Sequence, residues 1–303
     1  MNNVSHNAKL LYQVKDSKSA LRLIEINKTL NSEKLSVINA ALSQLMNSIH
    51  ESKEAVQYHD SELEGKIFRF VMGNSSLLKL LSKVSVQFNG KTYEKLDLPT
   101  IYSVTRMQIE SFIMIYYLSF TQGTTDERDM RYDLYKLHGL KKQSNYTVRT
   151  NYGEMKKEEV LKEYDDVMNS LKSRRSFISL DSKLKKDMLK LKYAKVIKPH
   201  VLFRESGLSK VGFSDAWSLY SNHTHSEYIS DRQFKTYYGK KKQTKPDVKF
   251  NIQLHIILTS KLCKFLIDKF ESPKKVISRL DEASRIMIYT WGYQIVENIQ
   301  NES

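Results

Sequence analysis

Residues 97–120 read DLPTIYSVTRMQIESFIMIYYLSF, and the fold assignment is built on them. Asp97 is suited to an N-cap, and Pro99 suits a first helical turn, where its missing N–H costs nothing. The apolar residues that follow occupy nearly every direction around a helical wheel: Ile101, Val104, Met107, Ile109, Phe112, Ile113, Ile115 and Leu118. A helix that is apolar on all sides is normally buried in a core. We therefore expect a central buried helix in an all-α helical bundle.

Two charged residues interrupt this apolar helix. Arg106 and Glu110 are four residues apart and so lie on one face, which Tyr102 and Tyr117 extend. Charges inside a core are costly unless they are paired. We expect Arg106 and Glu110 to pair with each other or to face a polar cleft.

The composition is strongly basic. Lys and Arg number 49 and Asp and Glu 34 among 303 residues, which gives a net charge of +15. Such a surplus attracts polyanions such as RNA, because binding releases their counterions. The alternative is a soluble protein whose helices carry many surface lysines.

Few residues of this chain break helices or form covalent cross-links. Ten Gly and four Pro favour long helices with short connections, and the single Cys263 excludes an internal disulfide framework and a CxxC zinc site. The N-terminus has no basic-then-apolar signal pattern. The longest apolar run, residues 112–118, is far shorter than the ~20 residues of a spanning helix. We expect a cytoplasmic protein with no membrane span.

Apolar periodicity and breaker residues predict the other elements. Asn89-Gly90 flanked by alternating residues indicates a hairpin over 84–96, and the alternative is an irregular loop, because a two-stranded hairpin without a neighbour is only marginally stable. Loops are expected at 141–153, 201–212 and 230–247. Helices are expected at 17–30, 31–58 (capped by Ser32), 63–84 (interrupted near Gly73–Asn74), 126–140, 154–173, 181–195, 213–229, from about Phe250 to a break at Ser272–Pro273, and 276–299. The expected organisation is an N-terminal helical extension, 1–60, and a main bundle, 61–303, or a single domain.

The segment 217–230, WSLYSNHTHSEYIS, contains the candidate catalytic residues. On one helix, Trp217, Ser221 and His225 share a face, and His223 points away from it. A histidine can act as general acid or base near neutral pH. If this face meets Arg106 and Glu110, the cleft suits metal-independent RNA cleavage, with His225 as base or acid, Ser221 orienting and Arg106 holding the phosphate. The alternative is a hydrogen-bonded structural histidine.

The chain resembles a bacterial helical family of unknown function at Arg106-x3-Glu110 and Trp217-x3-Ser221-x3-His225. That family in turn resembles the HEPN helical bundles, many of which are ribonucleases in toxin–antitoxin and phage-defence systems. The resemblance implies a HEPN-like core with extra helices, and a homodimer or an antitoxin-like protein partner. The HEPN signature is an arginine followed by four to six residues and a histidine on one helix. No arginine stands there before His223 or His225, so Arg106 would replace it from another helix.

A metal site is not expected. His223-x-His225 could be combined with Glu227 and Asp231, but residues two apart on a helix diverge by about 200°. The chain also contains no P-loop, GxGxxG, HExxH or GxSxG. We therefore expect neither a metal nor a cofactor.

A cluster of lysines and tyrosines follows the histidines and is a candidate nucleic-acid-binding loop: Tyr237, Tyr238, Lys240, Lys241, Lys242 and Lys245. Aromatic rings can stack on unpaired bases while lysines hold the backbone. Further basic pairs are Lys141-Lys142, Arg174-Arg175, Lys185-Lys186 and Lys274-Lys275. Each of these clusters can also be read as a solvated face.

Three functional hypotheses follow from the sequence. The first is a HEPN-like, metal-independent endoribonuclease or abortive-infection effector. The second is a helical module that binds a nucleic acid or a nucleotide without cutting it. The third is a protein-interaction scaffold in which Arg106 and Glu110 form a structural pair.

Overall fold

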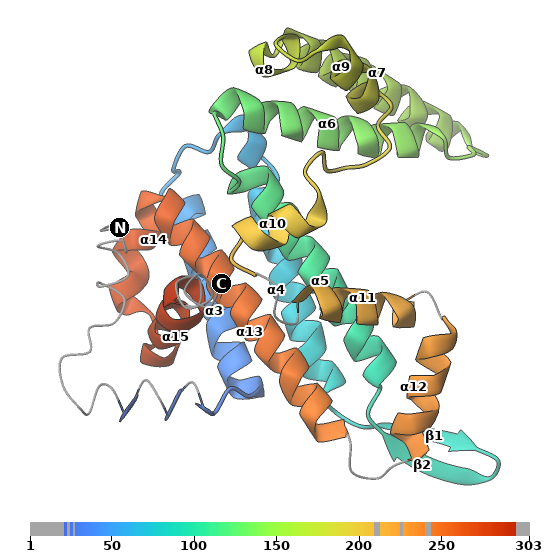
Figure 1. Ribbon diagram of the computed structural model, residues 1–303, viewed down its shortest axis with the longest axis vertical. Helices are drawn as coiled ribbons and strands as arrows, with labels where there is room; N and C mark the ends of the chain where they lie inside the picture. Colours follow the sequence, from blue (N-terminus) through green and yellow to red (C-terminus); the bar gives the residue numbers. More distant parts are fainter. Residues whose placement is uncertain are drawn as a thin grey trace. The chain divides into compact units, whose positions relative to one another are not determined.

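The computed structural model describes residues 21–22, 25–26, 28–208, 213–224, 227–239 and 244–294. Its elements are helices apart from one two-stranded antiparallel sheet (Figure 1), which confirms the predicted all-α class with a small hairpin. The chain forms two compact units. Unit 1 comprises Met1–Ala55, Glu64–Ile113 and Gly207–Ser303, and unit 2 comprises Val56–Leu63 and Met114–Ser206. This division differs from the expected boundary at residue 60, because residues before 56 pack with elements from the end of the chain.

Two long helices of unit 1 are α3 (Ser32–Glu51) and α4 (Leu63–Leu80, of which Leu63 belongs to unit 2). Asn31 caps α3 by accepting a hydrogen bond from Lys34 N at 3.0 Å, so the expected cap at Ser32 is wrong by one residue. Helix α3 ends before residue 58, near Lys53, whose φ of 49° is left-handed. Helix α4 is not interrupted at Gly73.

The predicted hairpin is confirmed. Strands β1 (Val84–Phe88) and β2 (Lys91–Lys95) pair antiparallel, with Phe88 opposite Lys91. Asn89 and Gly90 both have positive φ, as the tight turn between twisted strands requires.

The central helix is also confirmed as α5 (Leu98–Ser119). Asp97 caps it, because its Oδ1 accepts from Thr100 N at 3.2 Å. Most of its apolar side chains are fully buried, including Ile101, Ile109, Phe112 and Ile115. Helix α5 contributes its first part to unit 1 and its last part to unit 2.

The rest of unit 1 is more broken than the sequence predicts. The expected helix 213–229 is α11 (Phe213–Thr224) followed by α12 (Tyr228–Gly239), and α12 occupies part of the expected loop 230–247. The expected helix 276–299 is also divided, because Asp281 accepts from Ala283 N and Ser284 N and so starts a new helix. The remaining elements are α13 (Thr244–Lys269), α14 (Glu271–Val276), η2 (Ile277–Arg279), α15 (Glu282–Met287) and the π-helical η3 (Ile288–Gln294).

Helix α13 is the core helix of unit 1 and packs against α3 and η3. Its segment Val248–Lys269 is long and apolar enough to cross a membrane, but 72% of that window is buried inside the structure. Burial of this kind is the environment of a core helix.

A buried polar network crosses the core of unit 1, with Asn74 of α4 at its centre. Asn74 Nδ2 donates to Asn39 Oδ1 on α3 and to Thr259 Oγ1 on α13, both at 2.9 Å. Asn74 Oδ1 accepts from Gln108 Nε2 of α5 at 2.8 Å and lies 2.8 Å from His255 Nδ1 on α13. The network therefore fixes four helices to one another with directional bonds.

Gly73 explains how Gln108 reaches this network. A Cβ at residue 73 would lie 2.5 Å from Gln108 Oε1, closer than any normal contact. Gln108 Nε2 also donates to Phe70 O at 2.7 Å. The glycine that the sequence reading took for a helix interruption thus allows close packing of α5 on α4.

Unit 2 is built on α6 (Thr125–Ser144) and α7 (Asn151–Ser173), which lie side by side (Figure 1). Thr124 and Glu127 form a capping box at the start of α6, which continues past Gly139. Buried apolar residues from both helices and the following turns make its core: Met130, Leu134, Leu137, Leu140, Val160, Val167, Leu171, Phe177 and Leu191.

Short elements complete unit 2: η1 (Tyr58–Asp60), α8 (Arg175–Ile178), α9 (Ser182–Leu189) and α10 (Pro199–Glu205). Helix α9 ends six residues earlier than the expected helix 181–195, because Leu191 adopts a left-handed φ of 52° and buries its side chain. Helix α10 overlaps the expected connection 201–212, and Pro199 stands in its first turn.

Candidate functional site

The charged stripe of α5 is an ion pair. Arg106 Nη2 lies 3.1 Å from Glu110 Oε1, and the two side chains are 15% and 48% exposed. Pairing was one of the two expected arrangements and is confirmed. The carboxylate therefore offsets the charge of the arginine that was predicted to hold a phosphate.

Trp217 of α11 joins this pair. Its Nε1 donates to Glu110 Oε1 at 3.2 Å, and Arg106 Cζ lies 5.8 Å from the centre of its ring. The two helices that carry the R-x3-E and aromatic-x3-S-x3-H patterns thus meet within unit 1. Arg106, Glu110 and Trp217, which are three of the five residues in these patterns, contact one another.

Of the other two predicted catalytic residues, Ser221 does not join the contact of Arg106, Glu110 and Trp217 in the part of the chain that the structure describes. Ser221 donates its hydroxyl proton to Trp217 O of its own helix at 2.8 Å, a bond common within helices. His225 lies outside the described residues. The described part of α11 ends at Thr224.

His223, which was expected to point away, instead contacts α5. Its ring lies 4.7 Å from that of Tyr102, and its Nε2 donates to Gln233 Oε1 of α12 at 2.6 Å. Burial lowers the pKa of His223, and the bond to Gln233 partly opposes this change. Tyr102 also stacks on Tyr220 with ring centres 4.9 Å apart, and both tyrosines are buried. Packed aromatic rings therefore form part of the contact between α5 and α11.

The predicted nucleic-acid-binding loop lies only in part within the described residues. Lys240, Lys241 and Lys242 lie outside the described residues. Tyr237 and Tyr238 belong to helix α12, and Lys245 belongs to the first turn of α13. These last three residues are therefore helical and do not lie on a loop.

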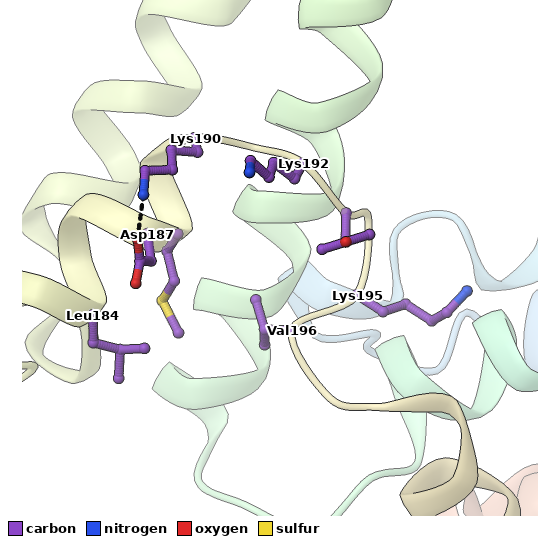
Figure 2. A pocket seen from close by; sticks show the side chains of 8 residues that line it. Leu184, Asp187, Lys190, Lys192, Lys195 and Val196 are labelled. Atoms are coloured by element: carbon purple, nitrogen blue, oxygen red, sulfur yellow. Dashed lines mark hydrogen bonds and ion pairs between the residues drawn. The ribbon is translucent and has the colours of Figure 1, made fainter.

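A basic hollow of about 380 Å³ lies in unit 2, between α9 and the loop that follows it. We call residues 183–198 the basic segment; it contains seven lysines and one acidic residue, Asp187. Figure 2 shows the lysines along the loop, with Leu184 of α9 across from Val196. The lining residues are Leu184, Asp187, Met188, Lys190, Lys192, Tyr193, Lys195 and Val196.

The charged side chains around this hollow are mostly positive. Lys190 of the lining lysines pairs with Asp187, the one acidic residue of the basic segment, at 2.5 Å. Lys141 of α6 donates to Lys190 O at 3.1 Å, which brings a further positive charge to the loop. Burial, followed by the charges of Lys142, Lys195 and Lys141, lowers the pKa of His138. The three lysines thus add to the effect of burial on His138.

An aromatic side chain stands at this hollow. Tyr193 is 77% exposed, although it lies between lysines on a short loop. The sequence reading named Lys185-Lys186 in this region and missed Tyr193. The signal that could have located it is the alternation of lysine with aromatic and apolar residues after Asp187.

A second polar cluster lies inside unit 2 and was not predicted. Arg174 binds two carboxylates of α6, with Nη1 3.2 Å from Asp129 Oδ2 and Nε 2.9 Å from Asp133 Oδ2. His59 Nδ1 lies 2.8 Å from Asp129 Oδ1, and Tyr58 donates its hydroxyl to Asp133 Oδ1 at 2.7 Å. Burial and the bond to Asp133 raise the pKa of Tyr58.

This cluster fastens η1 and the end of α7 to α6. Arg174, which the sequence placed in a basic pair with Arg175, is thus engaged by acidic residues and has little charge left for a phosphate. The spacing of Asp129 and Asp133 on one face of α6 was the available signal.

In the described part of the chain, no group of three or more His, Cys, Asp or Glu residues could hold a metal ion.

Comparisons with protein-family models, with curated proteins and with solved structures found no match to this chain.

Proposed function

We propose that this protein binds single-stranded nucleic acid, RNA in particular, through the basic segment of unit 2. The observation that supports this most directly is the exposed ring of Tyr193 at a hollow lined by Lys190, Lys192 and Lys195. Lysines attract the phosphates, and a base can stack on the tyrosine at a gain of about 1–3 kcal/mol. The single Cys263 fits a reducing cytosol, where we place this activity.

Salt-dependent binding tests this proposal. Fluorescence anisotropy of a fluorescein-labelled oligouridylate gives the affinity of the full-length protein over a range of salt concentrations. For Lys192→Gln with Lys195→Gln, we expect weaker binding and a slope of log affinity against log salt that is shallower by about 0.7 for each lost phosphate contact. Tyr193→Ala should weaken binding about tenfold or more without changing that slope.

The matched control is Lys157→Gln with Lys162→Gln on α7. These two lysines are exposed and stand among acidic residues of the same unit. The control has the same net charge as the test variant and should keep the wild-type affinity and slope. Equal loss in both double variants would show that only net charge matters and would reject a site at the basic segment.

We also propose, as a second candidate, the cytosolic ribonuclease of abortive-infection type. The supporting observation is the contact of Trp217 with Glu110, which joins the helices that carry its candidate residues. For cleavage, a phosphate would have to displace Glu110 from Arg106. Purified protein should then cleave RNA in the presence of EDTA, and His225→Ala should abolish cleavage while leaving the circular dichroism spectrum unchanged. Equal cleavage by that variant would exclude this mechanism, and binding without cleavage would leave the first proposal.

A further inference from the structure

The hairpin β1–β2 of unit 1 is amphipathic. The register pairs Val86 with Tyr93 and Phe88 with Lys91, so these side chains share one face with Val84. The other face carries polar residues alone: Ser85, Gln87, Thr92 and Glu94. Strands with this alternation normally cover a core with their apolar face.

Here the apolar face is exposed. Val84, Val86, Phe88 and Tyr93 are 48%, 52%, 66% and 41% exposed. A two-stranded hairpin is only marginally stable in water without a neighbour on its apolar face. Contiguous exposed apolar groups of this kind are typical of interaction sites.

The strand edges are open as well. In the part of the chain that the structure describes, the sheet has two strands, and the outward-facing backbone groups of Ser85, Gln87, Thr92 and Glu94 receive no backbone hydrogen bond from another element. Each outer edge therefore presents alternate N–H and C=O groups that an additional strand could pair with.

The charges around the face are positive. Lys83 precedes β1, Lys91 lies opposite Phe88, and both are exposed. Glu94, the one acidic residue of the two strands, is on the polar face. A second copy of this chain would bring lysines against lysines, which is unfavourable. Nucleic acid could stack on Phe88 and Tyr93, but it cannot use the open strand edges or match the two valines.

We propose that this hairpin binds an extended acidic segment of a partner protein, which adds a strand to an open edge and lays its apolar side chains on the exposed face. The main-chain bonds would supply affinity, and the alternation of acidic and apolar residues would supply specificity. This surface belongs to unit 1 and is independent of the nucleic-acid site proposed in unit 2.

The probe is a fluorescein-labelled peptide of alternating Glu and Val, and its anisotropy is measured with the full-length protein. Three further peptides test the alternation of residues, the charge and the main-chain hydrogen bonds separately. They are a peptide with the same residues in two blocks, an alternating Lys and Val peptide, and the first peptide with alternate amides N-methylated. We expect binding of the alternating acidic peptide and at least about tenfold weaker binding of the other three, which corresponds to about 1.4 kcal/mol.

Variants at exposed positions locate the site. Val86→Thr with Phe88→Thr keeps strand-forming residues but removes the apolar face, and should weaken binding of the acidic peptide about tenfold. Gln87→Thr on the polar face is the matched control and should bind as the wild type does. Lys91→Glu should weaken the acidic peptide and strengthen the basic one.

Several results would overturn the proposal. One is that the block peptide or the N-methylated peptide binds as tightly as the alternating acidic peptide. Another is that Val86→Thr with Phe88→Thr binds the acidic peptide with unchanged affinity. A third is that this double variant loses self-association, which would identify a second copy of the chain as the occupant. Loss of oligouridylate binding in the same variant would instead assign the face to nucleic acid. The circular dichroism spectrum of each variant checks that the helices are intact.

Discussion

Glu110 Oε1 accepts a hydrogen bond from Trp217 Nε1 at 3.2 Å, although the two residues are 107 positions apart in the chain. The same oxygen atom lies 3.1 Å from Arg106 Nη2. One carboxylate therefore organises the predicted stripe of α5 and attaches α11 to it.

This arrangement predicts an order of stability losses. Trp217→Phe removes a single hydrogen bond and should lower the free energy of unfolding by about 0.5–1.5 kcal/mol, towards the lower value because Glu110 is half exposed. Glu110→Ala removes the bond and the ion pair together and should cost more. Urea unfolding measures both, and Glu94→Ala on the hairpin should stay within about 0.5 kcal/mol of the wild type. Equal stability of all three variants would show that the contact does not hold α11.

Two glycines of α4 should respond to alanine in opposite directions. Gly73→Ala places a Cβ 2.5 Å from Gln108 Oε1, so it should destabilise the protein by about 1–3 kcal/mol despite the better helix propensity of alanine. Gly65→Ala meets nothing within 4 Å and should stabilise the protein by up to about 1 kcal/mol. Thermal unfolding of the two variants gives the signs. A stabilising Gly73→Ala would mean that Gln108 can withdraw from the network at little cost.

The buried histidine of unit 1 predicts a dependence of stability on pH. Burial lowers the pKa of His255 to about 3, whereas an unfolded histidine titrates near 6.5. The unfolded state therefore binds a proton that the folded state does not. This effect destabilises the protein as the pH falls below about 6.5, by up to about 1.4 kcal/mol for each pH unit.

The test is to compare the wild type with His255→Gln. The variant should be less stable at neutral pH because it disturbs the bonds to Asn74 and Thr105. The difference between the two proteins should shrink as the pH falls from neutral towards about 5, where carboxylates still contribute little. A constant difference over that range would show that His255 is not responsible.

His138 reports on the charges around the basic hollow. Its pKa is lowered by burial and by Lys142, Lys195 and Lys141, so Lys142→Gln should raise it. Oligouridylate bound at the hollow should raise it also, because phosphates offset the lysine charges. NMR titration of the His138 ring measures both changes. Lys162→Gln on α7 is the control, and a pKa that oligouridylate does not alter would place the bound strand elsewhere.

Local patterns in the sequence were sufficient for α5 and for the hairpin. The helix follows from its apolar periodicity and the Asp97 cap, and the hairpin follows from Asn89-Gly90, whose backbone conformation few other residues adopt. Pairing of Arg106 with Glu110 was predictable for the same reason, because both residues lie on one helix.

Contacts between distant segments were not predictable in this way. Nothing near His59 in the sequence indicates Asp129, and nothing near Asn74 indicates His255, because tertiary packing brings these pairs together. The sequence predicts one helix over 213–229, whereas the structure describes α11 up to Thr224 and a second helix, α12, from Tyr228. The contact of His223 with Tyr102 is likewise a product of tertiary packing, which no residue near His223 in the sequence indicates.

The passage of the chain through α5 has a consequence for synthesis on the ribosome. The chain leaves unit 1 after Ile113 and returns at Gly207, so all of unit 2 has been translated by Ser206. Unit 1 must wait for α13, because Asn74 obtains Thr259 and His255 as partners only when that helix emerges. During this interval α3 lacks the core helix that packs on it, and Asn74 lacks two of its four hydrogen-bond partners.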